Sequence, residues 1–264
     1  MKALIKIGGT LLDEPESRNR LASEIASAIK NGLEAVVVHG GGKQMTRFLA
    51  ERGIESRFVD GLRVTTPEIL DAVLKVLAGS VNQELVAAFV AAGVKAVGLT
   101  GMDALLTEAT QVSEDLGFVG KPTKFNVQLL DILTQNGFFP VVACLAGDRQ
   151  GRFYNVNADQ MASSIASAIH ADKLFFLTDV DGVKGQDGGV LDEISLDLCR
   201  QLIASGVATG GMRAKLEAAS EAVRSNVGEV RIAPGALRGV IQKALDSSAF
   251  GTRLVASIGA SCHD

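Results

Sequence analysis

Three consecutive glycines between two apolar segments are the feature of this sequence with the clearest chemical meaning. Residues 35–38 predict a buried strand, residues 40–42 are all glycine, and residues 43–52 predict a helix. Glycine lets backbone N–H groups approach an anion closely, and the N-terminus of a helix adds partial positive charge. The pattern predicts an anion site, although a tight strand-to-helix turn without a ligand explains one such turn equally well.

Two common phosphate-binding loops are excluded by the residues around these glycines. A Walker A loop requires glycine five positions before the Gly-Lys pair and serine or threonine after it, where this chain has Val37 and Gln44. A dinucleotide-binding fingerprint would need another glycine at the position of Met45. The glycines therefore need a different explanation.

Four further groups of residues have types that could do chemistry. Lys6 stands in an apolar run, where an ammonium group is costly unless it meets an anion. Residues 155–159 form a polar cluster before a predicted helix, and Lys215 lies one turn into a helix that follows a flexible turn. Residues 179–183 resemble the start of a calcium loop, but the later ligands and the closing glutamate are missing. Each feature alone also has a structural explanation, as an edge-strand lysine, a helix cap or a turn.

Length, composition and charge restrict the class of protein. The chain has 264 residues, 47% of them hydrophobic and 21% charged, as in a globular protein with a sizeable core. No apolar run approaches the roughly 20 residues of a membrane span, and the short apolar start is no signal peptide. The formal net charge of −4, without a basic block, argues against nucleic acid as a partner. Cysteines at positions 144, 199 and 262 lack metal-ligand spacing and favour reduced thiols in the cytoplasm.

Strands and helices alternate along the chain. Strands are predicted at residues 3–7, 35–38, 94–99, 105–111, 138–144, 173–178, 229–232 and 252–256. Helices are predicted at residues 15–30, 43–52, from 67, from a Ser80/Gln83 capping box to 93, from an Asn126 cap to 137, 158–170, 196–205, 212–225 and 237–246. This order predicts the α/β class, with a three-layer α/β/α sandwich around a mostly parallel open sheet. The loops at residues 8, 40, 100, 155 and 179 are expected along one rim, at the carboxyl ends of the strands.

Taken together, six motifs resemble those of one family. They are Lys6-Ile7-Gly8-Gly9, His39-Gly40-Gly41-Gly42, Gly61-Leu62-Arg63-Val64-Thr65, Asn155-Val156-Asn157-Ala158-Asp159, Thr178-Asp179-Val180-Asp181-Gly182-Val183 and Gly211-Met212-Arg213-Ala214-Lys215. In this order and at similar spacing they resemble the N-acetylglutamate kinases, a branch of the amino acid kinase family, over roughly residues 3–255. The first and fifth motifs are shared across the wider family, whereas residues 61–65 with 155–159 point to the acetylglutamate branch.

The resemblance implies an enzyme that transfers the γ-phosphoryl group of ATP to the side-chain carboxylate of N-acetyl-L-glutamate, in arginine synthesis. That carboxylate is already ionised at pH 7, so positioning and positive charge matter more than a general base. His39 is therefore expected to shape its loop rather than to act as a base. Mg²⁺ is expected to arrive on the phosphates without a protein ligand, because it keeps its waters.

The resemblance also implies a role for each matched residue. One domain, residues 1–264, is expected to contain a substrate lobe to about residue 170, a nucleotide lobe over about residues 171–256 and a polar tail at residues 257–264. Lys6 and Lys215 would supply positive charge, and Asp159 would hold both lysines. The substrate site is matched by Gly41, Gly42, Arg63 and Asn155, and Arg63 would grip the α-carboxylate. The nucleotide site is matched by Gly8, Gly9, Asp179, Val180, Asp181, Gly182, Val183, Lys184, Val207, Ala208 and Thr209, and no residue is assigned to a metal.

Two departures from the family pattern leave the acyl-amino acid open. Ala104 stands where glycine is expected, and residues 120–122 differ from an acidic segment in relatives. One alternative is a sister kinase of another acylated amino acid, such as a carrier-linked aminoadipate in lysine synthesis, against which the intact residues 155–159 argue. The other is a catalytically inactive nucleotide-binding sensor, against which Lys6, Asp159 and Lys215 argue.

Assembly and regulation are predicted from the chain ends and from one helix. Arginine-inhibited members of the family share a helix before the first strand that interlaces dimers into a hexamer, whereas here the first strand is predicted from residue 3. Residues 244–252 match the arginine-contacting segment only at the closing Gly-Thr. The apolar helix at residues 69–77 offers a two-fold contact, or else packs on its own sheet. We expect an arginine-insensitive homodimer.

Overall fold

An open eight-stranded sheet runs through the molecule, for which the computed structural model describes residues 1–246 and 250–257. The strand order is β12-β14-β13-β11-β1-β2-β8-β5, and neighbours are parallel except for β13 and β14. The strands are β1 (Lys2–Ile7), β2 (Glu34–His39), β5 (Lys95–Thr100), β8 (Phe138–Ala143), β11 (Lys173–Thr178), β12 (Glu193–Ser195), β13 (Glu229–Pro234) and β14 (Thr252–Val255). The predicted α/β class with a mostly parallel sheet is confirmed. Most of the predicted polar tail, with Cys262, lies outside the described residues.

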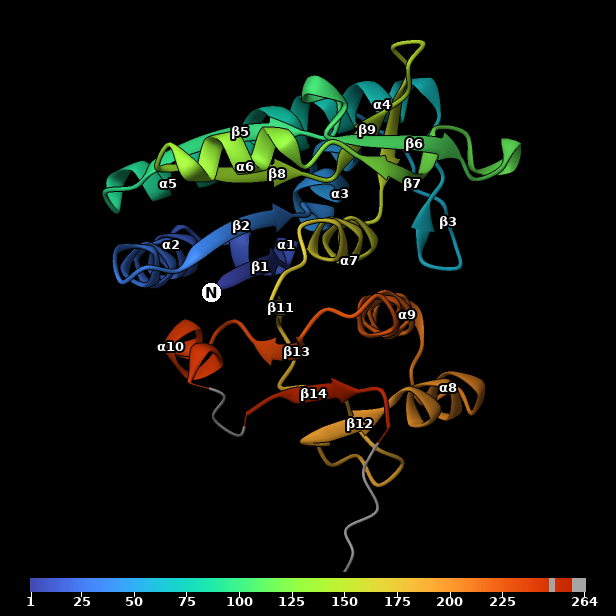
Figure 1. Ribbon diagram of the computed structural model, residues 1–264. Coiled ribbons are helices and arrows are strands. Elements are labelled where there is room, and N and C mark those ends of the chain that lie inside the picture. Colours follow the sequence, from blue (N-terminus) through green and yellow to red (C-terminus); the bar gives the residue numbers. More distant parts are fainter. Residues whose placement is uncertain (247–249, 258–264) are drawn as a thin grey trace, which may run out of the picture.

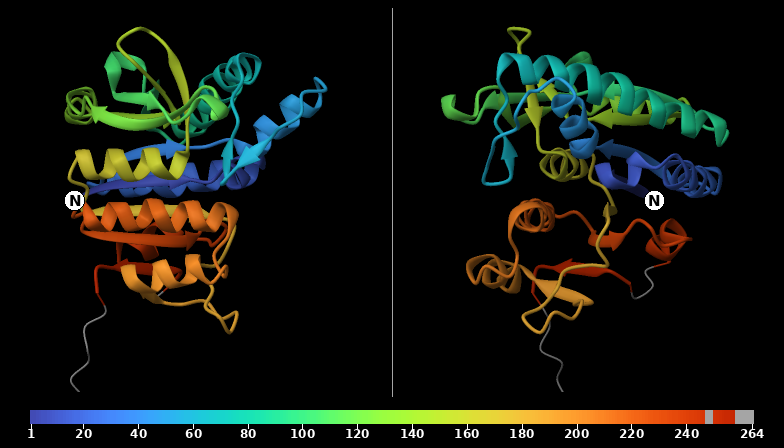
Figure 2. Two further views of the ribbon diagram at one scale, coloured as in Figure 1. Left: turned by 90° about the vertical axis from the view of Figure 1, so that its right-hand side faces the viewer. Right: turned by 180° about the vertical axis from the view of Figure 1, so that it is seen from behind.

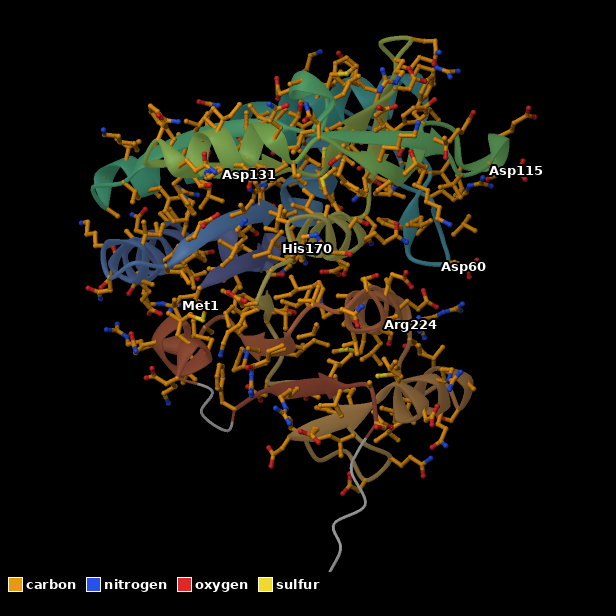
Figure 3. All side chains as sticks on the ribbon, in the orientation of Figure 1. Met1, Asp60, Asp115, Asp131, His170 and Arg224 are labelled. Carbon is orange, nitrogen blue, oxygen red and sulfur yellow. The ribbon has the colours of Figure 1, made fainter. Side chains whose placement is uncertain are left out.

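Helices cover both faces of this sheet. The α-helices of the described residues are α1 (Gly9–Asp13), α2 (Pro15–Lys30), α3 (Gly42–Ala50), α4 (Pro67–Val73), α5 (Asn82–Ala91), α6 (Gln128–Gln135), α7 (Ala158–Ala168), α8 (Leu196–Ala204), α9 (Gly210–Arg224) and α10 (Val240–Leu245). In Figure 1 α7 and α9 lie on one side of the central strands and α2 and α10 on the other, and the rear view in Figure 2 agrees. Figure 3, in the same orientation, shows an upper half that carries Asp115 and Asp131 and a lower half that carries Arg224. Because α7 packs on β1, β2 and β11 and also against α9, it joins these two halves of the molecule.

Several short strands lie outside the main sheet. β6 (Thr107–Gln111), β7 (Val119–Phe125), β9 (Leu145–Gly147) and β10 (Phe153–Val156) form a small closed barrel, and β3 (Phe58–Val59) pairs with β4 (Leu62–Arg63) as a hairpin. The prediction that residue 155 lies in a loop at the carboxyl end of a main-sheet strand is wrong, because Asn155 lies within β10 of the barrel. Of these strands only β6 was predicted, because the others are short or rich in polar residues and lack a continuous apolar run.

The prediction of two separate helices from residues 67 and 80 is wrong, because one long helix runs over Pro67–Ala91. Between α4 and α5 it passes through a π-helical segment, η1 (Leu74–Val81), which contains Ser80. By length and composition the long helix could cross a membrane, and 39% of its most apolar window is buried inside the molecule. It packs on β5 and β8 through α5, as a helix of a globular core does.

The turn before β6 explains two further differences from the predictions. Ala104 and Leu105 have φ angles of 50° and 51°, in the left-handed region, so the strand begins only at Thr107. Asn126 does not cap a helix; its Nδ2 donates to the Ala104 carbonyl oxygen at 2.9 Å, and α6 begins at Gln128. Ala104 thus has a backbone conformation that glycine adopts most easily, which agrees with the glycine expected there.

Candidate active site

Three charged side chains from distant parts of the chain meet between the two halves of the molecule. Lys6 lies near the end of β1, Asp159 in the first turn of α7 and Lys215 in the second turn of α9, and all three are buried. The Lys6 Nζ lies 2.8 Å from Asp159 Oδ1, and the Lys215 Nζ lies 3.0 Å from Oδ2. We call these residues the cavity cluster. The structure brings together the three residues that the resemblance singled out for charge.

The cavity cluster has more positive than negative charge. Burial raises the pKa of the Asp159 carboxyl, but the charges and hydrogen bonds of Lys6 and Lys215 outweigh it and hold that pKa below its usual range. Burial, together with the charge of Lys6, lowers the pKa of Lys215 to about 8 despite its contact with Asp159. One carboxylate therefore faces two ammonium groups, and the site suits an additional anion.

Helix capping fixes the carboxylate of this cluster. Asn157 precedes α7, and its Oδ1 accepts hydrogen bonds from the backbone N–H groups of Asp159 at 2.9 Å and Gln160 at 3.1 Å. Capping sets the first turn of α7 and hence the direction of the Asp159 side chain. The predicted polar cluster at residues 155–159 therefore both caps α7, through Asn157, and contributes Asp159 to the site.

The two glycine turns lie against each other beside the cavity cluster. A Cβ atom on Gly9 would lie 3.0 Å from the nitrogen of Gly42, so the backbones are in close contact only because side chains are absent. A Cβ atom on Gly41 would lie 2.4 Å from Leu77 Cδ2 of the long helix. Gly8 is tied to β11 through its N–H, which donates to the Leu177 carbonyl oxygen at 2.9 Å. The N–H groups in the first turn of α3 have no intrahelical acceptor and are available to an anion.

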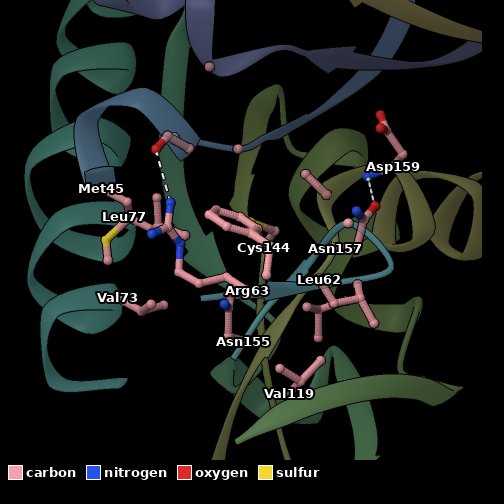
Figure 4. Close-up of a pocket in the computed structure, with 18 of the residues that line it drawn as sticks. Met45, Leu62, Arg63, Val73, Leu77, Val119, Cys144, Asn155, Asn157 and Asp159 are labelled. Carbon is pink, nitrogen blue, oxygen red and sulfur yellow. Dashed lines mark hydrogen bonds between the residues drawn. The ribbon is translucent and has the colours of Figure 1, made fainter. Parts of the chain in front are cut away.

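A cavity of about 220 Å³ opens next to these turns. Figure 4 shows Arg63 near the middle of the lining residues with Asn155 beside it, and Asp159 apart from both, at the upper right. Its polar lining includes Lys6, Gly9, Gly41, Gly42, Arg63, Asn155 and Asp159, and its apolar lining includes Met45, Leu62, Val73, Leu77, Val119 and Cys144. The cavity is therefore apolar along its walls and positive at two places, which fits a small dianion with an apolar part.

Arg63 is the second positive place. It lies in β4 and is buried, and burial lowers the pKa of its guanidinium from the ordinary value. Its Nη2 donates to Thr46 Oγ1 at 2.8 Å, its Nη1 donates to Ser56 Oγ, and the group lies 4.6 Å from the Phe58 ring centre. These contacts are to neutral groups, so the charge is not cancelled locally and can bind a carboxylate.

The predicted nucleotide residues lie in two other loops. Asp179, Val180, Asp181, Gly182, Val183 and Lys184 follow β11, and Val207, Ala208 and Thr209 precede α9. The Val183 N–H donates to Thr252 Oγ1 at 2.8 Å, which anchors the first loop to β14. Burial raises the pKa of the Asp179 carboxyl, but hydrogen bonds from its own backbone, Thr10 and Thr178, with the charge of Lys43, bring it below its usual range. Of the described residues that line the cavity, none comes from these two loops.

No metal site accompanies these residues. Within residues 1–246 and 250–257 there is no group of three or more histidine, cysteine or acidic side chains placed to hold a metal ion. Both oxygens of Asp159 contact lysine ammonium groups. These two oxygens are therefore engaged by the lysines of the cavity cluster.

Several residues of the site were not found by the sequence analysis. Ser56 and Thr46 hold Arg63, and Leu77 and Cys144 form part of the cavity wall. No local signal identifies them, because each is an ordinary residue of a loop, helix or strand. They reach the cavity only through the packing of segments far apart in the sequence.

Comparison with known proteins gives a consistent result. The model described as "Amino acid kinase family" matches residues 1–234. The acetylglutamate kinase of Solibacter usitatus is 57% identical over 255 residues, which cover 97% of this chain and 99% of that protein. The acetylglutamate kinase of Koribacter versatilis is 45% identical over 261 residues, which cover 98% and 100%.

A solved structure is also similar over almost the full length. The crystal structure of smu.665 from Streptococcus mutans UA159 aligns with a TM-score of 0.84 at 30% sequence identity. The alignment covers 97% of this chain and 99% of that chain. The whole architecture, including both halves of the molecule, is therefore shared with that structure.

Proposed function

This chain belongs to the amino acid kinase family, and we propose that its cavity holds N-acetyl-L-glutamate while the γ-phosphoryl group of ATP is transferred to it. The chain is an ATP-dependent kinase that forms N-acetyl-L-glutamyl 5-phosphate in arginine biosynthesis, a function supported by its high identity to several acetylglutamate kinases. The observation that carries the assignment to this cavity is its excess of positive charge at two separated places, the cavity cluster and Arg63.

The acceptor has two carboxylates, and the cavity offers one cationic place for each. Arg63 and Asn155 bind the α-carboxylate, because a guanidinium can bond both oxygens of a carboxylate at once. The apolar wall surrounds the aliphatic chain and the acetyl group. The side-chain carboxylate then faces Lys6 and the glycine turns. Its oxygen attacks the γ-phosphorus, the bond from that phosphorus to the β,γ-bridging oxygen breaks, and ADP leaves.

Charge and position account for the catalysis in this proposal. Two anions must approach each other, so Lys6, Lys215 and the backbone N–H groups of Gly41 and Gly42 stabilise the charge on the transferring group. Asp159 keeps both lysines in place. No general base is needed, since the carboxylate is ionised, and the buried neutral His39 is not required as one.

ATP is proposed to bind across the loops after β11 and before α9. Exposed Val180 and Val207 offer apolar surface there, and the start of α9 offers the positive end of a helix dipole to the phosphates. Mg²⁺ would be carried on the phosphates and would neutralise part of their charge, because the cavity cluster leaves no carboxylate oxygen for it. The free, buried Cys144 and Cys199 support a reducing compartment such as the cytoplasm.

An assay of ADP release with different acceptors tests the substrate. N-acetyl-L-glutamate, N-acetylaminoadipate, glutamate and aspartate are compared at equal ATP, and we expect the highest kcat/KM with N-acetyl-L-glutamate. A preference for the aminoadipate derivative would instead support the sister-kinase alternative. ADP release with none of the acceptors, alongside measurable nucleotide binding, would support the inactive sensor.

A homodimer is proposed from the exposed face of the long helix and the neighbouring sheet edge. Leu70, Leu74 and Ala78 recur every four residues on the long helix and are only partly buried, and β5 is the last strand of the sheet. A second copy related by a two-fold axis would cover both features. Light scattering with and without millimolar L-arginine, beside the kinase assay, is expected to show an arginine-insensitive dimer; a hexamer or strong inhibition would contradict this.

A further inference from the structure

The chain carries a buried polar contact directly behind the glycine turn that the reaction itself does not use. His39 is the last residue of β2, and Asn82 is the first residue of α5. Both side chains are buried, and the Asn82 Nδ2 lies 3.0 Å from the His39 Nε2. The His39 Nδ1 lies 2.9 Å from the carbonyl oxygen of Gly40. Buried polar groups of this kind need an explanation, since ordering them in an apolar interior is costly.

The partners determine which ring nitrogen carries the proton. A carbonyl oxygen can only accept, so the Nδ1 must be protonated to bond Gly40. The Nε2 then presents a lone pair, and the amide of Asn82 donates to it; the same amide nitrogen also donates to the Val141 carbonyl oxygen at 3.0 Å. Burial is the main cause that lowers the pKa of His39 to about 4, so the ring is neutral at physiological pH. The Gly40 carbonyl and the Asn82 amide therefore favour the same tautomer of His39.

The position of the Gly40 carbonyl oxygen determines the direction of the Gly41 N–H group. The peptide bond between Gly40 and Gly41 is planar and trans, so its C=O and N–H point in opposite directions. With the oxygen held by His39 on the inner side, the N–H of Gly41 points away from His39. Glycine on both sides of this peptide would otherwise permit it to rotate freely. Gly41 itself lines the cavity.

The long helix holds the same turn from a second direction. Leu77 lies in η1 and occupies the space where a Cβ atom of Gly41 would stand, and Asn82 follows η1 directly. A π-helical turn contains an extra residue, which changes the direction of the side chains that follow it. Here Leu77 of η1 packs against Gly41, and Asn82, which follows η1, contacts His39. Such segments are frequent at functional sites.

We propose that His39 and Asn82 are positioning residues, which aim the Gly41 N–H at the transferring phosphoryl group through the Gly40 carbonyl. This rests on the proposed function, because it assumes that the phosphoryl group is transferred beside Gly41. Neither residue touches a reacting atom. Their effect is on kcat, since a donor aimed correctly at the transition state lowers the barrier without strengthening ground-state binding.

The first test is a spectrum of the unaltered protein. The chain has three histidines, His39, His170 and His263, so ¹⁵N-labelled imidazoles are few enough to resolve. We expect one ring with a protonated Nδ1 and an unprotonated Nε2 that does not titrate between about pH 5.5 and 8. The exposed His170 adopts the left-handed backbone region, which asparagine tolerates, so His170→Asn serves for assignment and as the activity control. A His39 ring that is charged at pH 7.5, or protonated at Nε2, would overturn the proposal.

Two substitutions of His39 then separate the two ring nitrogens. His39→Asn keeps an amide donor near the Nδ1 position, toward Gly40, whereas His39→Gln can present only its amide oxygen near the Nε2 position, where it accepts from Asn82 and leaves the Gly40 carbonyl without the donor. We expect His39→Gln to lower kcat by about 10²-fold with little change in KM, and His39→Asn to retain at least about tenfold more of kcat. Thermal unfolding of both variants checks that they are folded to the same extent.

The outcomes separate this proposal from the function on which it rests. Equal losses of kcat in His39→Asn and His39→Gln at equal stability would contradict the positioning role while leaving the kinase assignment intact. An unaltered protein that releases no ADP with any acceptor would contradict the function. The tautomer of His39, read from the spectrum, tests the predicted contacts in either case.

Discussion

Two largely buried charged clusters of similar composition lie toward opposite ends of the strands of the main sheet. The cavity cluster combines Lys6, Lys215 and Asp159 at the carboxyl ends of the strands. At the other end Lys173, Arg231 and Glu229, here called the edge cluster, combine two cations with one carboxylate in the same way. Charge composition therefore does not distinguish a cluster that only stabilises the fold from one proposed to act in catalysis.

The difference lies in what contacts the surplus positive charge. Lys173 Nζ donates to the carbonyl oxygens of Ala244 and Leu245 at 3.1 and 3.2 Å, and Arg231 Nη1 donates to that of Phe250 at 2.7 Å. These carbonyls lie at the end of α10 and beyond it, so the edge cluster fastens the last helix to the sheet. In the cavity cluster, by contrast, Lys6 and Lys215 both contact the carboxylate of Asp159, and among the described residues no backbone carbonyl oxygen accepts from either ammonium group. Lys6 also lines the cavity, where its ammonium group can meet a substrate, whereas Lys215 lies behind Asp159 and is not part of the lining.

The largest expected effect follows from removing the surplus charge of the cavity cluster. Lys6→Ala or Lys215→Ala should lower kcat by about 10²–10³-fold, because each removes fixed positive charge at the transferring group. The measurement is ADP release at saturating substrates, with circular dichroism to verify the fold. Near-normal turnover in either variant would show that this lysine is not needed for catalysis. The two clusters would then not differ in the way proposed.

The next effect concerns Arg63, a buried cation in neither cluster. Arg63→Lys should raise the KM for N-acetyl-L-glutamate by about 10²-fold and that for ATP far less, because a point charge cannot bond both oxygens of a carboxylate. The two KM values are measured in the same assay, with the exposed Arg200→Lys as the matched control. An unchanged KM for the acyl-amino acid would mean that Arg63 does not bind it.

The edge cluster should respond in stability and not in activity. Lys173→Met removes the donor to the end of α10 while Arg231 still contacts Glu229, and we expect a loss of about 2 kcal/mol in the free energy of unfolding. Urea unfolding gives the stability, and kcat/KM measured at low temperature should equal that of the unaltered protein. If Lys173→Met instead lowered kcat at unchanged stability, the two clusters would be coupled and the comparison would fail.

The smallest effect is a dependence on pH that only the cavity cluster should produce. The pKa of Lys215 is lowered to about 8, so the ammonium group is lost as the pH rises through that value. We expect kcat/KM to fall by up to about tenfold per pH unit above it. Because an unfolded lysine titrates near 10.5, the unfolded chain binds more protons between these values, and the contribution of Lys215 to stability increases with pH there.

Between about pH 8 and 10, kcat/KM of the unaltered protein should therefore fall while the contribution of Lys215 to the free energy of unfolding rises. Lys215→Met, which carries no titrating group, should lose this part of the pH dependence of stability. A flat kcat/KM profile up to pH 9.5 would show that the charge of Lys215 is not needed in the free enzyme. The enzymes that couple ADP release to the measured signal are tested separately at each pH.

Local sequence determined much of this molecule before any packing was known. The strand predicted at residues 173–178 and the helix predicted at residues 15–30 have those bounds in the structure. Both have strong local signals: a continuous apolar run in the first, and a proline start with a glycine stop in the second. The glycine turns and the order of six motifs also indicated the family, because close backbone contact with an anion requires glycine at fixed places.

Only the tertiary structure decided which residues meet. Nothing near Lys6 predicts that its ammonium group lies 2.8 Å from a carboxylate 153 positions later, nor that Asn82 bonds His39. The predicted helix start at Ser80 is wrong for the same reason. The long helix stays continuous through Ser80 because it packs on the sheet and against Gly41, and a local pattern contains no information about that packing. Local propensities are worth tenths of a kcal/mol per residue, whereas burial of a side chain is worth about 1.5–3 kcal/mol, so packing decides where the two compete.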